Sequence, residues 1–349
     1  MAKDLKSTQV DKSVVLKGKL YPRLIFPTAK RLILPSVAKL TSQKLIEALG
    51  CSSKVIKKDV DKAISVGKSS NNTFQERAQA LMGHTRLKAW ITNAKSQMLL
   101  VNGNGCPEKT SPMTLACGML ARSLESFEGA FSLVFFCGMH SETANNEEGP
   151  ELMLAYLIHQ LLTSCQTFDL DFILKSQKRQ DIIDHDIDTL CFIFDGLVRQ
   201  LAKDQIVFCL IDGITFFEYR KRKESARQAI STIVDLVEEC NCVFKLLVTG
   251  STRSIVVYHL FSKDNILNLK AEPIRQSDQG LNIRRVLEQN SRSIESLSSE
   301  RHRNLHPQDE WSLSDSDGDD KEEATASSDV SSEDQNQDTG EGNSDGNLS

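Results

Sequence analysis

The residues best suited to chemistry lie in one glycine-rich stretch, residues 97–111. An apolar run there ends in Gly103, and Gly105, Lys109 and Thr110 follow it. In a phosphate-binding loop, a glycine, four residues and then Gly-Lys-Ser/Thr stand between a buried strand and a helix, so that backbone N–H groups and the lysine surround a phosphate. The spacing from Gly103 to Lys109 and Thr110 fits that pattern.

Two residues of this loop oppose phosphate binding. Glu108 occupies the place of the second glycine, where it adds a Cβ and a negative charge close to a polyphosphate. Pro107 removes one N–H group from the loop. These residues favour a structural turn between strand and helix over a working site, and no cofactor is assigned. Binding of ATP or GTP with Mg²⁺ is the alternative.

Polar residues also end two later apolar runs. Residues 207–212 end in Asp212. In a working nucleotide site, a carboxylate at the end of such a strand holds Mg²⁺ opposite the loop lysine. Glu218 follows Asp212. Residues 244–249 lead to Arg253, which could sense a γ-phosphate. If nucleotide binds, Asp212 and Thr110 would be the Mg²⁺ ligands. The alternatives are a turn-capping role for Asp212 and a salt-bridged loop position for Arg253.

The surrounding chain predicts alternating strands and helices. Strands are expected at 98–101, 131–136, 206–211, 244–249 and 266–269, and helices at 112–124, 150–163, 225–240 and, as a pair, 186–202. Continuous apolar strands separated by helices indicate a parallel sheet that is covered on both faces. We therefore predict an α/β domain over residues 74–275, with about five parallel strands sandwiched by helices. Polar residues at successive strand ends would meet at one edge of such a sheet.

The flanking segments differ from this domain in composition. Residues 1–73 are basic and punctuated by proline, which predicts a largely irregular segment with one helix near 42–49 and a polar linker at 69–73. Val66-Gly-Lys-Ser69 is half of a phosphate-loop pattern without its first glycine, and we set it aside. Residues 74–94 predict a single helix. Residues 276–349 predict a polar linker and a disordered acidic tail.

Charge and cysteine usage limit the partners and the compartment. The tail from Asp309 onward carries fourteen acidic residues and one lysine, which leaves 41 basic and 33 acidic residues before it, a net charge of +8. The basic run Arg220–Lys223 leaves nucleic acid open as a less favoured partner. Nine cysteines without a CxxC pair favour reduced thiols, and the spacing of Cys240 and Cys242 fits neither a zinc site nor a redox motif. Without an apolar span or signal core, we expect an intracellular protein, cytoplasmic or nuclear.

Five segments carry a resemblance to a known family. They are Leu-Leu-Val-Asn-Gly-Asn-Gly at 99–105, Val-Phe-Phe-Cys-Gly at 134–138, the predicted helix segment Leu-Ile-His-Gln-Leu-Leu at 157–162, Leu-Ile-Asp-Gly-Ile at 210–214 and Lys-Leu-Leu-Val-Thr at 245–249. In this order they resemble the nucleotide-binding domain of STAND-class P-loop ATPases, the NACHT and related signalling ATPases, particularly the degenerate versions of fungal proteins. The resemblance covers roughly residues 85–270. It implies a P-loop NTPase fold with Lys109 and Thr110 on phosphate and Mg²⁺, Asp212 on Mg²⁺ and Glu218 near water.

Three functional hypotheses follow. The leading one is a pseudo-NTPase that serves as an interaction or scaffold module for unidentified protein partners, without turnover. The alternative from the enzyme class is a weak ATP- or GTP-binding switch of the STAND type that uses Lys109 and Asp212. The third is a nuclear acidic-tail protein that binds basic partners and uses the folded domain only as a scaffold.

Overall fold

A computed structural model describes residues 40–125, 130–141, 149–164, 168–174 and 179–270, the short strands β1 (Val15–Leu16) and β2 (Lys19–Leu20), and isolated helical residues at 292, 295, 296 and 299. The chain divides into two units, Met1–Pro307 and Gln308–Ser349, and all described residues belong to the first. The predicted acidic tail and most of the predicted linker before it lie outside the described residues. So does most of the basic segment before residue 40.

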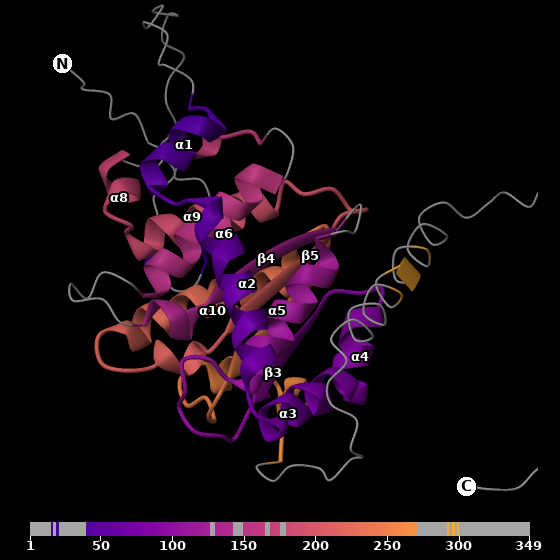
Figure 1. The fold of residues 1–349 in the computed structure, drawn as a ribbon. Helices are drawn as coiled ribbons and strands as arrows, with labels where there is room; N and C mark the ends of the chain where they lie inside the picture. The colour runs from indigo at the N-terminus through magenta and orange to yellow at the C-terminus, as the bar shows by residue number, and fades with distance from the viewer. Residues whose placement is uncertain are drawn as a thin grey trace, which may run out of the picture. The chain divides into compact units, whose positions relative to one another are not determined.

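Five parallel strands form the centre of the first unit. They are β3 (Gln97–Asn102), β4 (Ala130–Phe136), β5 (Ile206–Asp212), β6 (Val243–Gly250) and β7 (Ile266–Asn268), and they pair in the order β4-β5-β6-β3-β7. Figure 1 shows β3, β4 and β5 among the helices. The predicted α/β fold with a parallel sheet of five strands is confirmed.

The register of the strands brings their polar ends together. Asn102 pairs with Gly250 across β3 and β6, and Phe136 pairs with Asp212 across β4 and β5. Every residue of β5 and β6 is buried, which is expected of central strands covered on both faces. Each fully buried leucine or phenylalanine here contributes about 2 kcal/mol from the removal of its apolar surface from water.

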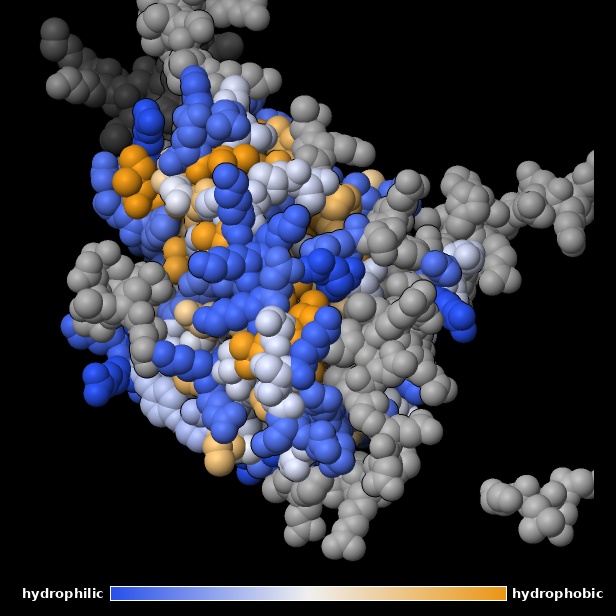
Figure 2. All heavy atoms as spheres, in the orientation of Figure 1, coloured by the Kyte–Doolittle hydropathy of each residue, from blue (hydrophilic) through white to orange (hydrophobic). Residues whose placement is uncertain are grey.

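Helices pack around the sheet in two groups. The first is α2 (Ser53–Ser69) and α3 (Asn72–Gly83), which pack on α5 (Pro112–Leu124), the connection from β3 to β4. The second is α6 (Pro150–Ser164), α9 (Ile187–Val198) and α10 (Arg222–Glu239), which pack on one another. Figure 1 shows α2 alongside α5. Hydrophilic residues predominate on the face viewed in Figure 2, with hydrophobic residues in small separate groups.

The remaining elements are short. They are α1 (Ser42–Leu49), α4 (Thr85–Thr92), α7 (Asp171–Leu174), α8 (Arg179–Ile183) and the 3₁₀ turns η1 (Cys137–His140), η2 (Ile214–Phe216), η3 (Val257–Leu260) and η4 (Lys263–Asn265). Within the described part of the chain, no helix is long and apolar enough to cross a membrane.

The segment before residue 74 is more helical than its composition predicts. Helix α1 is where the sequence places it, but α2 replaces the irregular structure expected up to about residue 70. Ile56, Val60 and Ala63 are buried along one face of α2 at helical spacing. Gly67 follows on the same face, where a Cβ would collide with the side chain of Leu115 in α5. The glycine of the half-pattern Val66–Ser69 is therefore a helix contact.

Two predicted helical segments are divided differently. Residues 74–94 are not one helix: α3 ends at Gly83 and α4 begins at Thr85, because His84 is extended with φ −67° and ψ 132°. Asn71, expected in a linker, caps α3 by accepting a hydrogen bond from Phe74 N at 2.9 Å. Residues 186–202 hold the single helix α9, with α8 before it, instead of a helical pair.

Candidate functional site

The glycine-rich loop joins β3 to α5, and its last residues cap the helix. Helix α5 begins at Pro112, with Ser111 as its N-cap. The Ser111 hydroxyl accepts hydrogen bonds from Met113 N at 3.2 Å and Thr114 N at 3.4 Å, and the Thr114 hydroxyl accepts one from Ser111 N at 3.0 Å. This reciprocal pair is a capping box. The N–H groups that a helix N-terminus offers to an anion are therefore already bonded here.

The glycines of the loop are held against the end of β6. Gly103 N donates to Gly250 O and Gly105 N donates to Ser251 O, both at 2.8 Å. A Cβ on Gly103 would lie 2.9 Å from both of those carbonyl oxygens, so only glycine fits. Glu108 N in turn donates to Cys106 O at 2.9 Å. These loop N–H groups thus bond to the chain itself.

Asp212 lies at the end of β5 with both carboxylate oxygens bonded. Its Oδ2 accepts from the Thr114 hydroxyl and its Oδ1 from the Thr249 hydroxyl, each at 2.6 Å. The side chain is 1% exposed. Burial raises the pKa of Asp212 from 3.8 to about 6, and the two threonine hydrogen bonds oppose that rise. Thr114, Asp212 and Thr249 form what we call the Asp212 clamp. It joins α5, β5 and β6.

Two cysteines share the surroundings of Asp212. Cys117 on α5 and Cys137 at the start of η1 are both buried. Burial is the main cause that raises the pKa of each thiol, and the neighbouring Asp212 charge raises both further. The thiols therefore stay protonated at neutral pH and add no charge beside Asp212.

Lys109 and Thr110 lie before the helix. Lys109 is exposed and Thr110 is half-buried. The Lys109 backbone packs closely on Gly138, where a Cβ would collide with its carbonyl group. In a phosphate-binding loop, the lysine directly precedes the hydroxyl residue that faces the strand-end carboxylate. The residue before Thr114 is Met113, which is 1% exposed and carries no charge.

Glu218 holds the segment that follows β6. Its side chain is 4% exposed. Its Oε1 accepts from the Ser254 hydroxyl at 2.5 Å, Val256 N at 3.1 Å and Val257 N at 2.9 Å, and its Oε2 accepts from Ile255 N at 2.9 Å. A carboxylate that accepts hydrogen bonds from several backbone N–H groups fixes the turn that carries them, and both Glu218 oxygens are used in this way.

Arg253 lies on an exposed loop and contacts an aromatic ring. Its guanidinium carbon is 5.1 Å from the ring centroid of Tyr258, a cation–π distance. The predicted site residues therefore fall into separate groups: Gly103 and Gly105 on the end of β6, Asp212 in a threonine clamp, Glu218 in a turn, and Lys109 and Arg253 on the surface. Sequence reasoning missed Thr114 and Thr249, and the signal for Thr114 was the Ser-Pro-Met-Thr start of a capped helix.

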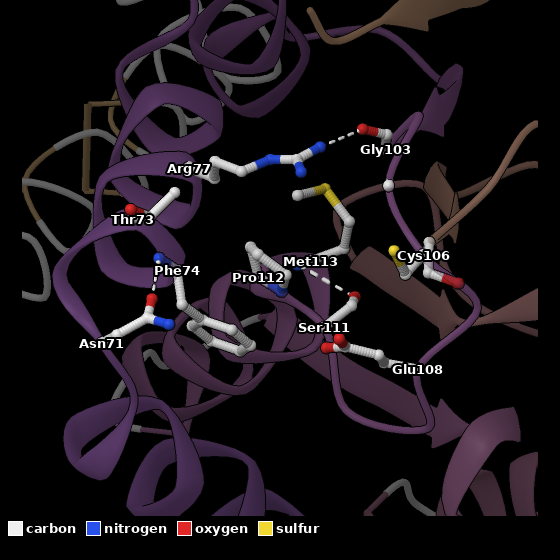
Figure 3. A pocket seen from close by; sticks show the side chains of 12 residues that line it. Asn71, Thr73, Phe74, Arg77, Gly103, Cys106, Glu108, Ser111, Pro112 and Met113 are labelled. Carbon is white, nitrogen blue, oxygen red and sulfur yellow. Dashed lines mark hydrogen bonds between the residues drawn. The ribbon is translucent and has the colours of Figure 1, made fainter. Parts of the chain in front are cut away.

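A pocket of about 210 Å³ lies between α3 and the loop (Figure 3). Arg77 reaches from α3 to donate to Gly103 O, and Phe74 and Glu108 also line the pocket. The Ser251 hydroxyl, which belongs to another lining residue, is buried and has no hydrogen-bond partner within the described residues. The lining includes none of Lys109, Thr110, Asp212 and Arg253. Within the described ranges, no group of three or more His, Cys, Asp or Glu could hold a metal ion.

The sequence of this region matches a known protein family. Residues 76–251 match the family model described as Nephrocystin 3, N-terminal. The chain belongs to this family. Among curated proteins, none matches it.

The nephrocystin-3 N-terminal match covers the contacts described above. It begins in α3, one residue before Arg77, and ends at Ser251, directly after β6. The loop and the Asp212 clamp lie inside it, whereas Arg253 and β7 lie outside it. The family segment thus contains both ends of the contact between the loop and β6.

Proposed function

We propose that this domain is a degenerate P-loop NTPase that works as an interaction or scaffold module without nucleotide turnover. The observation that carries the proposal is the clamp on Asp212: the carboxylate at the Mg²⁺ position is 1% exposed and bonded by threonines from two other elements. A relationship to the STAND and NACHT ATPases is part of this proposal. It is supported by the five-stranded parallel sheet and by the acidic residue at the end of β5.

Mg²⁺ binding at Asp212 would require changes in the clamp. With a pKa of about 6, the carboxylate is mostly ionised at neutral pH. Both of its oxygens already accept a threonine hydrogen bond, so a metal would have to displace one hydroxyl or share an oxygen with it. Hydrogen bonds to a charged group are worth about 1.5–3 kcal/mol each, so their exchange weakens any metal contact.

Phosphate binding by the loop faces a similar obstacle. The N–H groups of Gly103, Gly105, Glu108, Met113 and Thr114 already have acceptors within the chain. Each net hydrogen bond that must be broken costs about 1 kcal/mol, and every 1.4 kcal/mol is a tenfold loss of affinity. The Glu108 carboxylate adds repulsion toward an anion.

An exposed surface near the carboxyl edge of the sheet supports the interaction role. Tyr219 is 60% exposed and Ile255 is 62% exposed. Their segments are joined, because Glu218, the residue before Tyr219, accepts a hydrogen bond from Ile255 N at 2.9 Å. The basic run Arg220–Lys223 follows Tyr219 in the chain. An exposed aromatic and an exposed aliphatic side chain near positive charge suit a protein partner with an acidic and partly apolar segment.

Calorimetric and thermal-shift titration with magnesium-ATP and magnesium-GTP tests the proposal. We expect neither heat nor a change in melting temperature at about 1–5 mM nucleotide, a range that detects millimolar Kd values. Lys109→Ala should behave as the wild type does. Lys95→Ala, which removes another exposed lysine outside the loop, is the matched control. A saturable shift in the wild type that is lost in Lys109→Ala and kept in Lys95→Ala would refute the scaffold proposal.

A weak ATP- or GTP-binding switch is the second candidate, and the pocket beside the loop favours it. A buried hydroxyl without a partner, Ser251, and a guanidinium, Arg77, line the same pocket of about 210 Å³. Such groups can orient a small polar ligand. In the same titration, the switch hypothesis expects saturable binding by the wild type, and Arg77→Ala separates pocket binding from binding through Lys109.

A further inference from the structure

Two cysteine sulfurs meet in the turn that joins α10 to β6. Cys240 is the C-cap of α10, and Cys242 directly precedes β6. The Cys242 thiol donates to the Cys240 sulfur, with a distance of 3.6 Å between the two Sγ atoms. A disulfide has an S–S bond of about 2.0 Å, so closure requires the two sulfurs to approach by about 1.6 Å.

The backbone on both sides of the pair is fixed by other elements. Cys240 N donates to Leu236 O at 3.1 Å, which completes the last turn of α10. Val243 N donates to Gln205 O at 3.0 Å, and the Ser96 hydroxyl donates to Cys242 O at 3.4 Å. Because these bonds anchor the turn to α10 and to the chain before β3 and β5, the sulfurs are held as neighbours.

The two sulfurs differ in access. Cys240 is half-buried, so a small oxidant can reach it, whereas Cys242 is 3% exposed. The hydrogen bond from Cys242 is the largest cause that lowers the pKa of Cys240, and the nearby Arg199 guanidinium lowers it further. Arg199 is placed there by its 2.6 Å bond to Glu239, the residue before Cys240. Cys240 is therefore suited to attack and Cys242 to resolve.

We propose that Cys240 and Cys242 are a redox modification site that forms a reversible intramolecular disulfide on reaction with hydrogen peroxide. The Cys240 thiolate attacks one peroxide oxygen and the O–O bond breaks, which gives a sulfenic acid and, after protonation, water. The Cys242 sulfur then attacks the sulfenic sulfur, the S–O bond breaks and a second water leaves. The two thiols lose two electrons and two protons, and the hydrogen peroxide takes up both to become two waters. A thiol reductant reverses the reaction by exchange.

The proposal is independent of the scaffold function, and it revises what the sequence suggested for this pair. A spacing of one intervening residue matches no redox motif, so the sequence predicts reduced thiols. The structure changes that expectation because the chain turns between α10 and β6 and brings the sulfurs together. Elsewhere, burial raises the pKa of Cys51, Cys191 and Cys209, which makes those thiols poor nucleophiles.

Peptide mapping of the full-length protein tests the site. The protein is treated with hydrogen peroxide, alkylated and cut with trypsin. The fragment Gln228–Lys245 follows Arg227, ends at a lysine and contains only the two cysteines of the pair. We expect it to become about 2 Da lighter and to take up no alkyl group, and a thiol reductant should restore two alkylation sites. Cys106, which is exposed on the loop, is the internal comparison because it can oxidise without losing 2 Da within its own peptide.

Serine variants separate the roles of the two sulfurs. Cys242→Ser should stop the reaction at the sulfenic acid of Cys240, which a cyclic 1,3-dione traps. Cys240→Ser should leave Cys242 alkylatable after the same exposure. Cys106→Ser is the matched control and should retain the disulfide. The proposal is overturned if the wild-type fragment stays doubly alkylated under conditions that oxidise Cys106, or if Cys240 proceeds to sulfinic acid without the 2 Da loss. The wild-type result decides this even if a variant fails to fold.

Discussion

Replacing Asp212 by asparagine tests the interpretation of the strand-end clamp. The carboxylate is buried and accepts hydrogen bonds from Thr114 and Thr249, and its pKa is about 6 in place of 3.8. Each pH unit between the two pKa values is worth about 1.4 kcal/mol, so ionisation of Asp212 lowers the free energy of unfolding by about 3 kcal/mol. Asparagine has the same shape and does not ionise. Its amide can donate to one threonine hydroxyl and accept from the other.

The sign of the effect follows from proton binding in the two states. Below about pH 4, the carboxyl group is protonated in both the folded and the unfolded chain, so it contributes no pH dependence. Between about pH 4 and pH 6, the folded state keeps a proton that the unfolded state releases, and stability falls as the pH rises. Above pH 6 the loss is complete. The free energy of unfolding of Asp212→Asn should therefore equal that of the wild type near pH 4 and exceed it by up to about 3 kcal/mol at pH 7.5.

Urea unfolding at pH 4, 5, 6 and 7.5 measures this difference, with the fluorescence of Trp90 as the signal. Trp90 is 2% exposed and packs edge-on against Phe208 of β5, with 5.7 Å between ring centroids, so it reports on the core. Asp204→Asn, on an exposed turn, controls for the loss of one carboxylate. If the curves of Asp212→Asn and the wild type run parallel with pH, the buried-carboxyl argument is refuted. A variant several kcal/mol less stable at pH 7.5 would mean that the ionised form is favoured, as at a cation site.

Two further substitutions test the neighbouring contacts. Glu218→Ala should lower the free energy of unfolding by about 3 kcal/mol, because buried N–H groups of the turn after β6 lose their acceptor, and Glu218→Gln should lose less. Equal stability of Glu218→Ala and the wild type in urea would contradict the turn-holding role. Gly103→Ala should cost about 2 kcal/mol, since its Cβ would lie 2.9 Å from two carbonyl oxygens. Gly83→Ala, in open space at the end of α3, is the control, and thermal unfolding should show its free energy of unfolding raised by up to about 1 kcal/mol. A Gly103→Ala protein as stable as that control would show that the loop can move away from β6.

The sheet was predictable because its strands are continuous apolar runs. The short run at 206–211 between turn signals predicts a buried strand, and the structure extends it by one residue, to Asp212. The pairing order was not predictable from the same signal. Strands buried on both faces show no alternation that distinguishes one neighbour from another. The position of β6 between β3 and β5 therefore emerges only from the packing of the whole sheet.

The site was only partly predictable, because two sequence signals conflicted. The helix was correctly predicted to start at Pro112, yet the phosphate-loop pattern placed Lys109 and Thr110 at the helix start. The structure follows the capping signal: Ser111 caps the helix, and Thr114 in its first turn reaches Asp212. A local cap competes directly with a ligand for the same N–H groups, and sequence spacing alone does not show which of the two holds them.

The presence of glycine in the loop has less bearing on nucleotide binding than the pattern suggests. Gly103 is required by the carbonyl oxygens of Gly250 and Ser251 whether or not a phosphate is present. The loop tolerates Pro107 and Glu108 for a related reason: both are exposed and lie beyond the contact with β6. A loop under selection only for that contact would keep Gly103 and let the second glycine change. The scaffold proposal expects this combination of a kept Gly103 and a changed second glycine, and the Lys109 titration is the measurement that separates a structural loop from a distorted nucleotide site.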